Sequence, residues 1–267
     1  MLDMDHRRRL RALYDDQLRT DAETPSAATV TVLGPVRLVT LPGGRGFVTY
    51  RDLGGAGADA IDQLVAVSLA HYVSDPSIER VEWKTREHDH APGLHESLLR
   101  RGFVPEEPES IMIGQAQRLA VHVPLPDGLT LRRITAEHDV RAMCAMSAQV
   151  FGDSPAEAAA MVAELMHRLA LDDGIELWVA EAKGKVVSAG RLEPVPGTDF
   201  AGIWGGSTLA EWRGRGIYRA LTAARARSAL RLGKTLIHSD STEHSRPILE
   251  RYGFLRVSGT TPYLWSR

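Results

Sequence analysis

Glycine and arginine alternate in Arg213-Gly-Arg-Gly216, and the residues that follow, from Ile217, carry a helical pattern. Glycine has no Cβ, so the backbone can turn tightly there and approach a ligand closely. The N-terminus of a helix offers unpaired N–H groups and the positive end of its dipole, both of which attract an anion. With two guanidinium groups beside it, this turn predicts a binding site for a diphosphate.

The order of the elements around the turn makes the prediction more specific. Paired glycines also occur in ordinary turns between a strand and a helix, which is the plain structural alternative. Here an apolar strand over 200–208 leads into the turn and a helix over 217–232 leaves it. This combination resembles motif A of the GNAT N-acetyltransferase superfamily, in which Q/R-x-x-G-x-G/A follows a strand. Arg213 matches the first position and Gly216 the fourth, whereas Tyr218 stands where the family usually has glycine or alanine.

The resemblance covers residues 129 to 265 and implies an acyl-CoA-dependent N-acyltransferase. Such an enzyme moves an acetyl group directly from acetyl-CoA, or from another acyl-CoA, to a small-molecule amine, and we expect no metal. In the family, backbone groups of the strand before the turn pair with the pantetheine arm, as an added strand would. Carried over by position, the cofactor-binding residues are Gly206, Ser207, Thr208, Arg213, Gly214, Arg215, Gly216, Ile217, Tyr218 and Arg219.

Acetylation of an amine requires a base, because amines are largely protonated at neutral pH. Glu193 closes the predicted strand 186–192, and His238 lies in the predicted strand 236–239. Both strands border the substrate cleft in a GNAT-like sheet, so both residues are candidate catalytic residues. The alternatives are structural: a half-buried histidine that is simply hydrogen-bonded, and a glutamate that belongs to a loop.

The proton for the departing thiolate has a less obvious source. GNAT enzymes often use a tyrosine four residues before the glycine of a Gly-Phe pair, and that position is Leu249 here. Tyr263, in the last predicted strand, is the candidate replacement, although tyrosines in strands commonly serve packing. The missing tyrosine keeps a second hypothesis open, a non-catalytic acyl-CoA-binding regulatory or interaction protein.

A mixed scaffold must bring these residues together. Helices and strands are interspersed from Leu129 onward, which predicts an α/β fold with an α+β mixed sheet, mostly antiparallel and flanked by helices. Pro124-Leu-Pro-Asp-Gly128 marks a boundary, because proline and glycine end one unit before an apolar strand begins the next. We therefore expect two domains, 1–123 and 129–267.

The two halves share a local pattern. Residues 98–103, LLRRGF, match residues 249–254, LERYGF, and each segment ends a predicted helix before a strand. A common glycine C-cap is the alternative, but the matching order of elements favours two tandem GNAT-like domains. In the first half the counterpart of the turn is 51–58, where Asp52 and Asp59 bring negative charge. We therefore expect a degenerate N-terminal copy and one acyl-CoA per chain.

Composition argues against several other partners. The formal net charge is −2 and Lys and Arg are spread along the chain, so we expect no nucleic-acid partner. No apolar run reaches about 18 residues, so we expect no membrane partner. The single cysteine, Cys144, suits a reducing compartment, and we expect a cytoplasmic monomer or homodimer. The segment His88-Asp-His90 lacks a second set of ligands, so we expect no metal site there.

Overall fold

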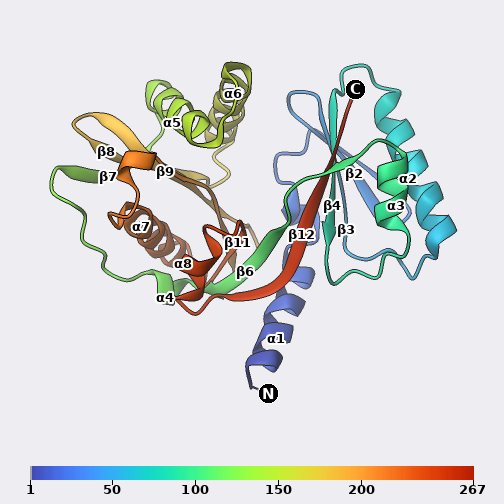
Figure 1. The fold of residues 1–267 in the computed structure, drawn as a ribbon, viewed down its shortest axis with the longest axis horizontal. Helices are drawn as coiled ribbons and strands as arrows, with labels where there is room; N and C mark the ends of the chain where they lie inside the picture. The colour runs from blue at the N-terminus through green and yellow to red at the C-terminus, as the bar shows by residue number, and fades with distance from the viewer. Residues whose placement is uncertain (1) are drawn as a thin grey trace. The chain divides into compact units, whose positions relative to one another are not determined.

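The computed structural model describes residues 2–267, whose contacts divide the chain into two compact units (Figure 1). Unit 1 consists of Met1–Ile111, Asp240–Glu243 and Arg256–Arg267, and unit 2 consists of Met112–Ser239 and His244–Leu255. Each unit has a mostly antiparallel sheet flanked by helices, which confirms the predicted fold class. Among residues 2–267, no helix is both long enough and apolar enough to cross a bilayer.

The sheet of unit 1 has the strand order β1-β2-β3-β4-β12, and β5 also pairs with β12. These strands pair antiparallel except β3 and β4, which are parallel and are joined by the crossover helix α2. The strands are β1 (Thr29–Leu33), β2 (Val36–Leu41), β3 (Arg45–Tyr50), β4 (Arg80–Arg86), β5 (Val104–Pro105) and β12 (Leu255–Ser266). The helices are α1 (Leu2–Gln17), α2 (Ala58–Val73) and α3 (Leu94–Arg100), with a 3-10 turn at Asp21–Glu23.

The core of unit 1 follows from the two-residue alternation of strand side chains. On β4, Val81 and Trp83 are both fully buried and belong to one apolar cluster. Helix α2 adds Ile61 and Val65 to the same cluster, and α3 adds Leu98. The apolar stripes of α2 and α3 therefore share one core with this face of the sheet.

Unit 2 has the strand order β6-β11-β10-β9-β8-β7, with β10 and β11 parallel. Helix α7 makes the crossover between those two strands, and Figure 1 shows α5 and α6 on the opposite face of the sheet from α7. The strands are β6 (Glu109–Gln115), β7 (Leu129–Ile134), β8 (Glu176–Ala182), β9 (Lys185–Pro194), β10 (Phe200–Thr208) and β11 (Leu236–Ser241). The helices are α4 (Ala116–Leu119), α5 (Glu137–Phe151), α6 (Pro155–Leu171), α7 (Ile217–Arg231) and α8 (Arg246–Glu250), with a 3-10 turn at Ala210–Trp212.

The compact units differ from the predicted ranges 1–123 and 129–267 in three places. Residues 112–123 pack in unit 2, and residues 240–243 and 256–267 pack in unit 1. The difference at residues 256–267 has a clear cause: Leu255–Ser266 forms one continuous strand, β12. This strand pairs with β4 from Thr260 to Ser266, so the end of the chain completes the sheet of unit 1.

Candidate active site

The Arg-Gly-Arg-Gly turn lies between β10 and α7, as the sequence predicts. Gly214 and Gly216 have left-handed backbones, with φ of 72° and 79°, and a Cβ at either position would meet no atom within 4 Å. Both glycines are therefore needed for backbone conformation, and the space beside them is open. Gly216 is the N-cap of α7 and makes no side-chain capping bond. The first N–H groups of α7 thus have no side-chain cap, which fits an anionic ligand.

Three exposed arginines surround this turn. The Nε of Arg213 donates to the carbonyl of Thr208 at 3.1 Å, and the guanidinium of Arg215 lies 4.9 Å from the ring centre of Trp212. The Nε of Arg219, in the first turn of α7, donates to the Tyr252 hydroxyl at 2.7 Å. All three keep N–H groups beyond these contacts, because a guanidinium has five. The charge and the open glycine backbone together fit a diphosphate.

Strand β10 leaves its regular ladder just before the turn. Its pairing with β9 shifts between Trp204 and Ser207, and Gly205 in this bulge has a φ of +60°. The parallel pairing with β11 runs from Phe200 to Gly202. A bulge turns backbone groups away from the ladder, so the end of β10 can offer amides to a ligand.

Tyr218 lies against this bulge and not over the glycine turn. A Cβ on Gly206 would come within 2.7 Å of Cε2 of Tyr218, so the ring and this glycine are in close contact. The large side chain at a usually small position is therefore accommodated by a glycine on the neighbouring strand. The ring of Tyr218 therefore packs beside the strand.

Hydroxyl groups hold the end of β10 in place. Ser188 on β9 donates to the carbonyl of Ser207 at 2.7 Å and lies 2.8 Å from the hydroxyl of Thr208. On the other side, the Ser207 hydroxyl lies 3.0 Å from that of Ser147 on α5. Ser207 and Thr208 are buried, so their side chains fix the strand and leave ligand contacts to the backbone.

Glu193 and His238 stand in one register row of the unit 2 sheet. Gly202 on β10 pairs with Glu193 on β9 on one side and with His238 on β11 on the other. Residues paired in this way project from the same face of a sheet. The structure therefore brings two of the three candidate catalytic residues together, with a glycine between them.

Both carboxylate oxygens of Glu193 are engaged in ion pairs. Oε2 accepts from Arg168 at 2.6 Å, and Oε1 accepts from Arg191 at 3.1 Å. Arg168 also pairs with Asp173 at 2.7 Å, and burial of this guanidinium is offset by the two carboxylates, which raise the pKa of Arg168. Sequence analysis missed Arg168. The one feature of the sequence that could have pointed to Arg168 is its spacing, three residues after Leu165, which places it on the buried face of α6.

His238 lies in an aromatic environment. The residue is 9% exposed, and its ring meets Trp204 edge-on, with ring centres 5.1 Å apart, and Phe200 at 5.9 Å. A Cβ on Gly202 would lie 2.2 Å from Nε1 of Trp204 and 3.1 Å from Nε2 of His238. The glycine therefore makes room for both rings on the face that also carries Glu193.

Tyr263 and Leu249 lie in apolar cores. Tyr263 belongs to unit 1, where it packs in the same cluster as Trp83 and its hydroxyl lies 2.7 Å from Nδ1 of His95. Its place follows from the pairing of β12 with β4, where Tyr263 faces Trp83 across the ladder. These contacts favour a packing role for Tyr263 over the role of an acid. Leu249 is fully buried in the core of unit 2.

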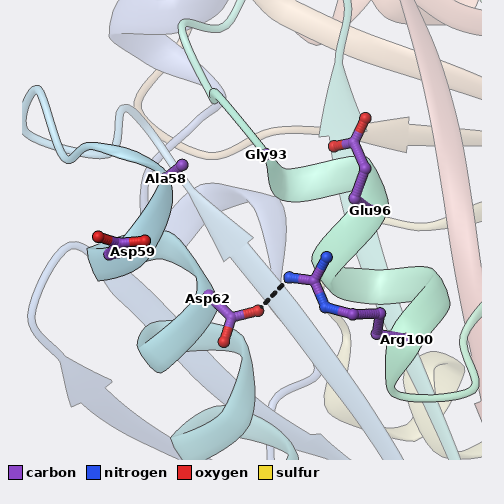
Figure 2. A pocket seen from close by; sticks show the side chains of 6 residues that line it. All are labelled: Ala58, Asp59, Asp62, Gly93, Glu96 and Arg100. Carbon is purple, nitrogen blue, oxygen red and sulfur yellow. Dashed lines mark hydrogen bonds and ion pairs between the residues drawn. The ribbon is translucent and has the colours of Figure 1, made fainter.

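The counterpart of the glycine turn in unit 1 leads to an acidic hollow of about 480 Å³ between α2 and α3 (Figure 2). Its lining residues are Ala58, Asp59, Asp62, Gly93, Glu96 and Arg100. Arg100, the single cation among them, pairs with Asp62 at 2.5 Å, and Arg101 also bonds to Asp62. These arginines hold the pKa of the Asp62 carboxyl far below its usual range. The lining keeps an excess of negative charge, which repels a diphosphate.

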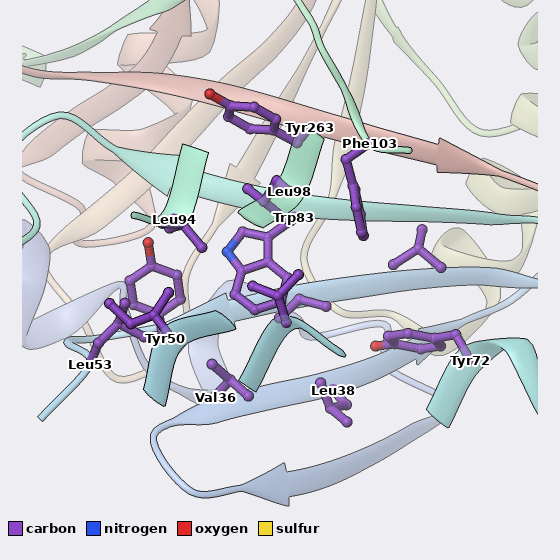
Figure 3. Packing of buried hydrophobic residues seen from close by; sticks show 14 of the residues in the cluster. Val36, Leu38, Tyr50, Leu53, Tyr72, Trp83, Leu94, Leu98, Phe103 and Tyr263 are labelled. Carbon is purple, nitrogen blue, oxygen red and sulfur yellow. The ribbon is translucent and has the colours of Figure 1, made fainter. Parts of the chain in front are cut away.

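Aromatic side chains fill the region of unit 1 that corresponds to the end of β10 (Figure 3). The described parallel pairing of β3 with β4 ends at Val48 and Trp83. Beyond it, the rings of Tyr50 and Trp83 lie 6.4 Å apart, and those of Trp83 and Phe103 lie 6.5 Å apart. Apolar packing thus occupies unit 1 where unit 2 has a glycine-rich bulge.

The histidines of this part of the sequence make other contacts in unit 1. His88 lies 2.6 Å from the Ser258 hydroxyl and 3.1 Å from Asp15, while His95 contacts Tyr263. Within residues 2–267, no group of three or more histidine, cysteine or acidic side chains is arranged to hold a metal ion.

Comparison with solved structures places the chain among proteins with a GNAT fold. A GCN5-related N-acetyltransferase from Kribbella flavida is 15% identical, with 96% of this chain and 93% of that chain covered and a TM-score of 0.64. A tandem GNAT protein from the clavulanic acid biosynthesis pathway is 14% identical, with 96% and 94% covered and a TM-score of 0.61. A functionally unknown conserved protein from Staphylococcus epidermidis is 14% identical, with 90% and 94% covered and a TM-score of 0.70.

These likenesses span both units and define the class, a tandem protein of GNAT fold. The family model of the acetyltransferase (GNAT) family matches residues 143–254. The matched residues include the bulge of β10, the glycine turn and α7. No curated protein matches the sequence.

Proposed function

We propose that the chain is an acyl-CoA-dependent N-acyltransferase that moves an acetyl group from acetyl-CoA directly to a small-molecule amine. The observation that carries the proposal is the open Arg-Gly-Arg-Gly turn at the N-terminus of α7, within a domain of the acetyltransferase family. The amides of this turn and the guanidinium groups of Arg213, Arg215 and Arg219 bind the diphosphate. The backbone of Gly206 to Thr208 pairs with the pantetheine arm.

His238 is the proposed base. It projects from the face of the sheet that carries Trp204 and Glu193, and a neutral imidazole can accept a proton from an attacking amine. Glu193 is the weaker candidate, because each of its oxygens is already held by an arginine. We assign Glu193 a structural role: it holds Arg168 and Arg191 in place on the face of the sheet that also carries His238.

Thiol release tests this function. The wild-type protein is incubated with acetyl-CoA and a panel of amines, including aminoglycosides, polyamines, amino acids and peptides, and free CoA is measured. Amine-dependent release with stoichiometric N-acetylation of the acceptor supports the enzyme. Calorimetry with acetyl-CoA alone measures cofactor binding independently.

The base assignment has its own test. Replacement of His238 by Gln should lower kcat about 100-fold at neutral pH, because the amine then loses its proton without help. Activity of His238→Gln should recover as pH rises towards the pKa of the free amine. Glu193→Gln serves as the comparison and should retain more activity. A His238→Gln variant with wild-type kcat would rule out this base.

One observation favours a non-catalytic acyl-CoA-binding regulator as the second candidate. Leu249 occupies the position of the usual acid, and it is sealed in the apolar core of unit 2. Both candidates predict acetyl-CoA binding, but only the enzyme predicts amine-dependent thiol release. Cofactor binding by calorimetry without release for any acceptor would favour the regulator.

A further inference from the structure

Arg225 is a buried cation of unit 2 that the proposed chemistry leaves unused. It lies in the middle of α7 and is 1% exposed. The titratable groups that act on its charge are Tyr218 and Arg191, and no carboxylate of the described chain is among them. An arginine buried without a counter-ion costs much free energy, and a hydrophobic residue of similar size is often the more stable choice. Stability alone therefore does not explain a buried positive charge at position 225, which suggests a functional role for it.

The guanidinium of Arg225 binds backbone carbonyls of the sheet. Nη1 donates to the carbonyl of Arg191 on β9 at 3.0 Å and to that of Trp204 on β10 at 3.4 Å. Nη2 donates to the Thr222 hydroxyl at 3.2 Å within the helix. A Cβ on Gly190 would lie 2.6 Å from Nη1, so this glycine of β9 makes the room that the guanidinium occupies.

These contacts lie at the start of the β10 bulge. Trp204 and Arg191 are paired across the two strands, and the register shifts immediately after them. Gly205, the next residue, has the left-handed backbone of the bulge. Arg225 therefore holds the backbone from the α7 side at the point where β10 leaves its ladder.

We propose that Arg225 is a positioning residue whose positive charge fixes and polarises the backbone of the Trp204–Gly206 bulge. This inference rests on the proposed function. The amine nitrogen forms a bond to the thioester carbonyl carbon, the C–S bond breaks with its electron pair on sulfur, and the amine proton passes to the base. Negative charge arises first on the carbonyl oxygen and then on the sulfur, and the backbone N–H groups of a bulge that a fixed cation polarises would stabilise that charge.

Such a cation offers a physical substitute for the tyrosine that Leu249 replaces. A thiolate beside a fixed positive charge is a better leaving group, because its conjugate thiol has a lower pKa. Burial lowers the pKa of Arg225 to about 10, so the guanidinium remains charged at neutral pH.

Three substitutions separate charge from packing. Arg225→Met removes both the charge and the hydrogen bonds, Arg225→Gln keeps a donor without the charge, and Arg225→Lys keeps the charge. Ser228→Ala is the matched control, because Ser228 is also buried on α7 and bonds to Glu176. For each protein, kcat, the KM for acetyl-CoA, Tm, and the pKa of the thiol of bound CoA from thiolate absorbance are measured.

We expect Arg225→Met and Arg225→Gln to lower kcat about tenfold to a hundredfold, with the KM for acetyl-CoA within about threefold of wild type. The bound thiol should titrate at higher pH in both, and Tm should stay equal or rise. Arg225→Lys should retain most of the activity, and Ser228→Ala should match wild type in kcat and thiol pKa.

Wild-type kcat and thiol pKa in Arg225→Met would overturn the inference. Equal losses of Tm and cofactor affinity in all three Arg225 variants would also overturn it, because they indicate a purely structural role. The thiol titration needs no acceptor, so it separates this inference from the proposed function. Absence of thiol release in the wild type would refute only the latter.

Discussion

Gly216 shows how much depends on a single residue. Its left-handed backbone starts α7, and the open space beside it is where an anion can approach the first amides of the helix. A Cβ can be added there without coming within 4 Å of another atom of the protein. The effect of a substitution on ligand binding can therefore be separated from its effect on packing.

Gly216→Asp should weaken acetyl-CoA binding at least about tenfold, because a carboxylate would face the diphosphate. Gly233→Asp is the matched control: Gly233 follows the other end of α7, has a φ of 75° and also faces open space. The backbone strain is thus the same in both variants. Calorimetry with acetyl-CoA measures the difference, and equal affinities in the two variants would mean that the diphosphate site lies elsewhere.

Tyr263 gives a second prediction for a single residue. Tyr263→Phe removes the hydroxyl that lies 2.7 Å from His95, so the free energy of unfolding should fall by about 1 kcal/mol. The rate of acetyl transfer should not change, because Tyr263 belongs to the core of unit 1. Urea unfolding and thiol release measure the two effects. A tenfold fall in kcat at unchanged stability would restore Tyr263 as a candidate acid.

Among the elements, β10 carries most of the features on which the proposed cofactor binding depends. The same strand has a regular segment that pairs with β9 and β11, a glycine bulge, and a terminal segment that leads to the Arg-Gly-Arg-Gly turn. In unit 1 the corresponding strand, β3, has no glycine in its last four residues, which are Phe47 to Tyr50. Instead, Tyr50 packs there against Trp83, which leaves the first unit with a core in place of a cofactor groove.

Strand β6 carries a carboxyl group that should make stability depend on pH. Burial, together with the charges of Asp240 and Glu82, raises the pKa of Glu109 to about 6, while Lys84 opposes the shift. The folded state therefore binds the proton more tightly than the unfolded state, whose pKa is near 4.5. This contribution to stability is complete below the unfolded pKa and is lost as pH rises through about 6.

Glu109→Gln should remove that dependence. At about pH 8 the variant should be more stable than wild type by about 1 kcal/mol, a value reduced for the partial exposure of the side chain. At about pH 4 the two proteins should unfold at the same temperature, since both carry a neutral side chain there. Glu107→Gln, at an exposed position nearby, is the control and should change stability little at either pH. Equal Tm values of the wild type and Glu109→Gln at pH 8 would show that the pKa of Glu109 is not raised in the folded protein.

For the whole molecule, the two units predict one cofactor per chain although the fold occurs twice. The turn of unit 2 is open and basic, whereas the hollow of unit 1 is lined by carboxylates and its adjoining core is filled by aromatic rings. Calorimetry should give about one acetyl-CoA per chain, and Gly216→Asp should remove the binding heat. A second site, or heat that persists in that variant, would show that unit 1 binds the cofactor.

Much of this site could be predicted from sequence, because its signals are local. Two glycines that need a left-handed backbone, a strand before them and a helix after them all lie within residues 200–231. The mixed α/β class likewise followed from the order of elements, and the structure confirms it. Hydrophobic periodicity and turn chemistry act over a few residues, so they can be read without knowing which strands meet.

Only the tertiary structure decided which distant residues meet. The strand that carries Tyr263, β12, pairs with β4, about 180 residues earlier in the chain, and no local pattern encodes that choice of partner. The ion pair of Glu193 with Arg168 and the room that Gly190 gives to Arg225 are also long-range facts. Local backbone preferences thus set the Arg-Gly-Arg-Gly turn, whereas strand pairing and burial decided which side chains surround it.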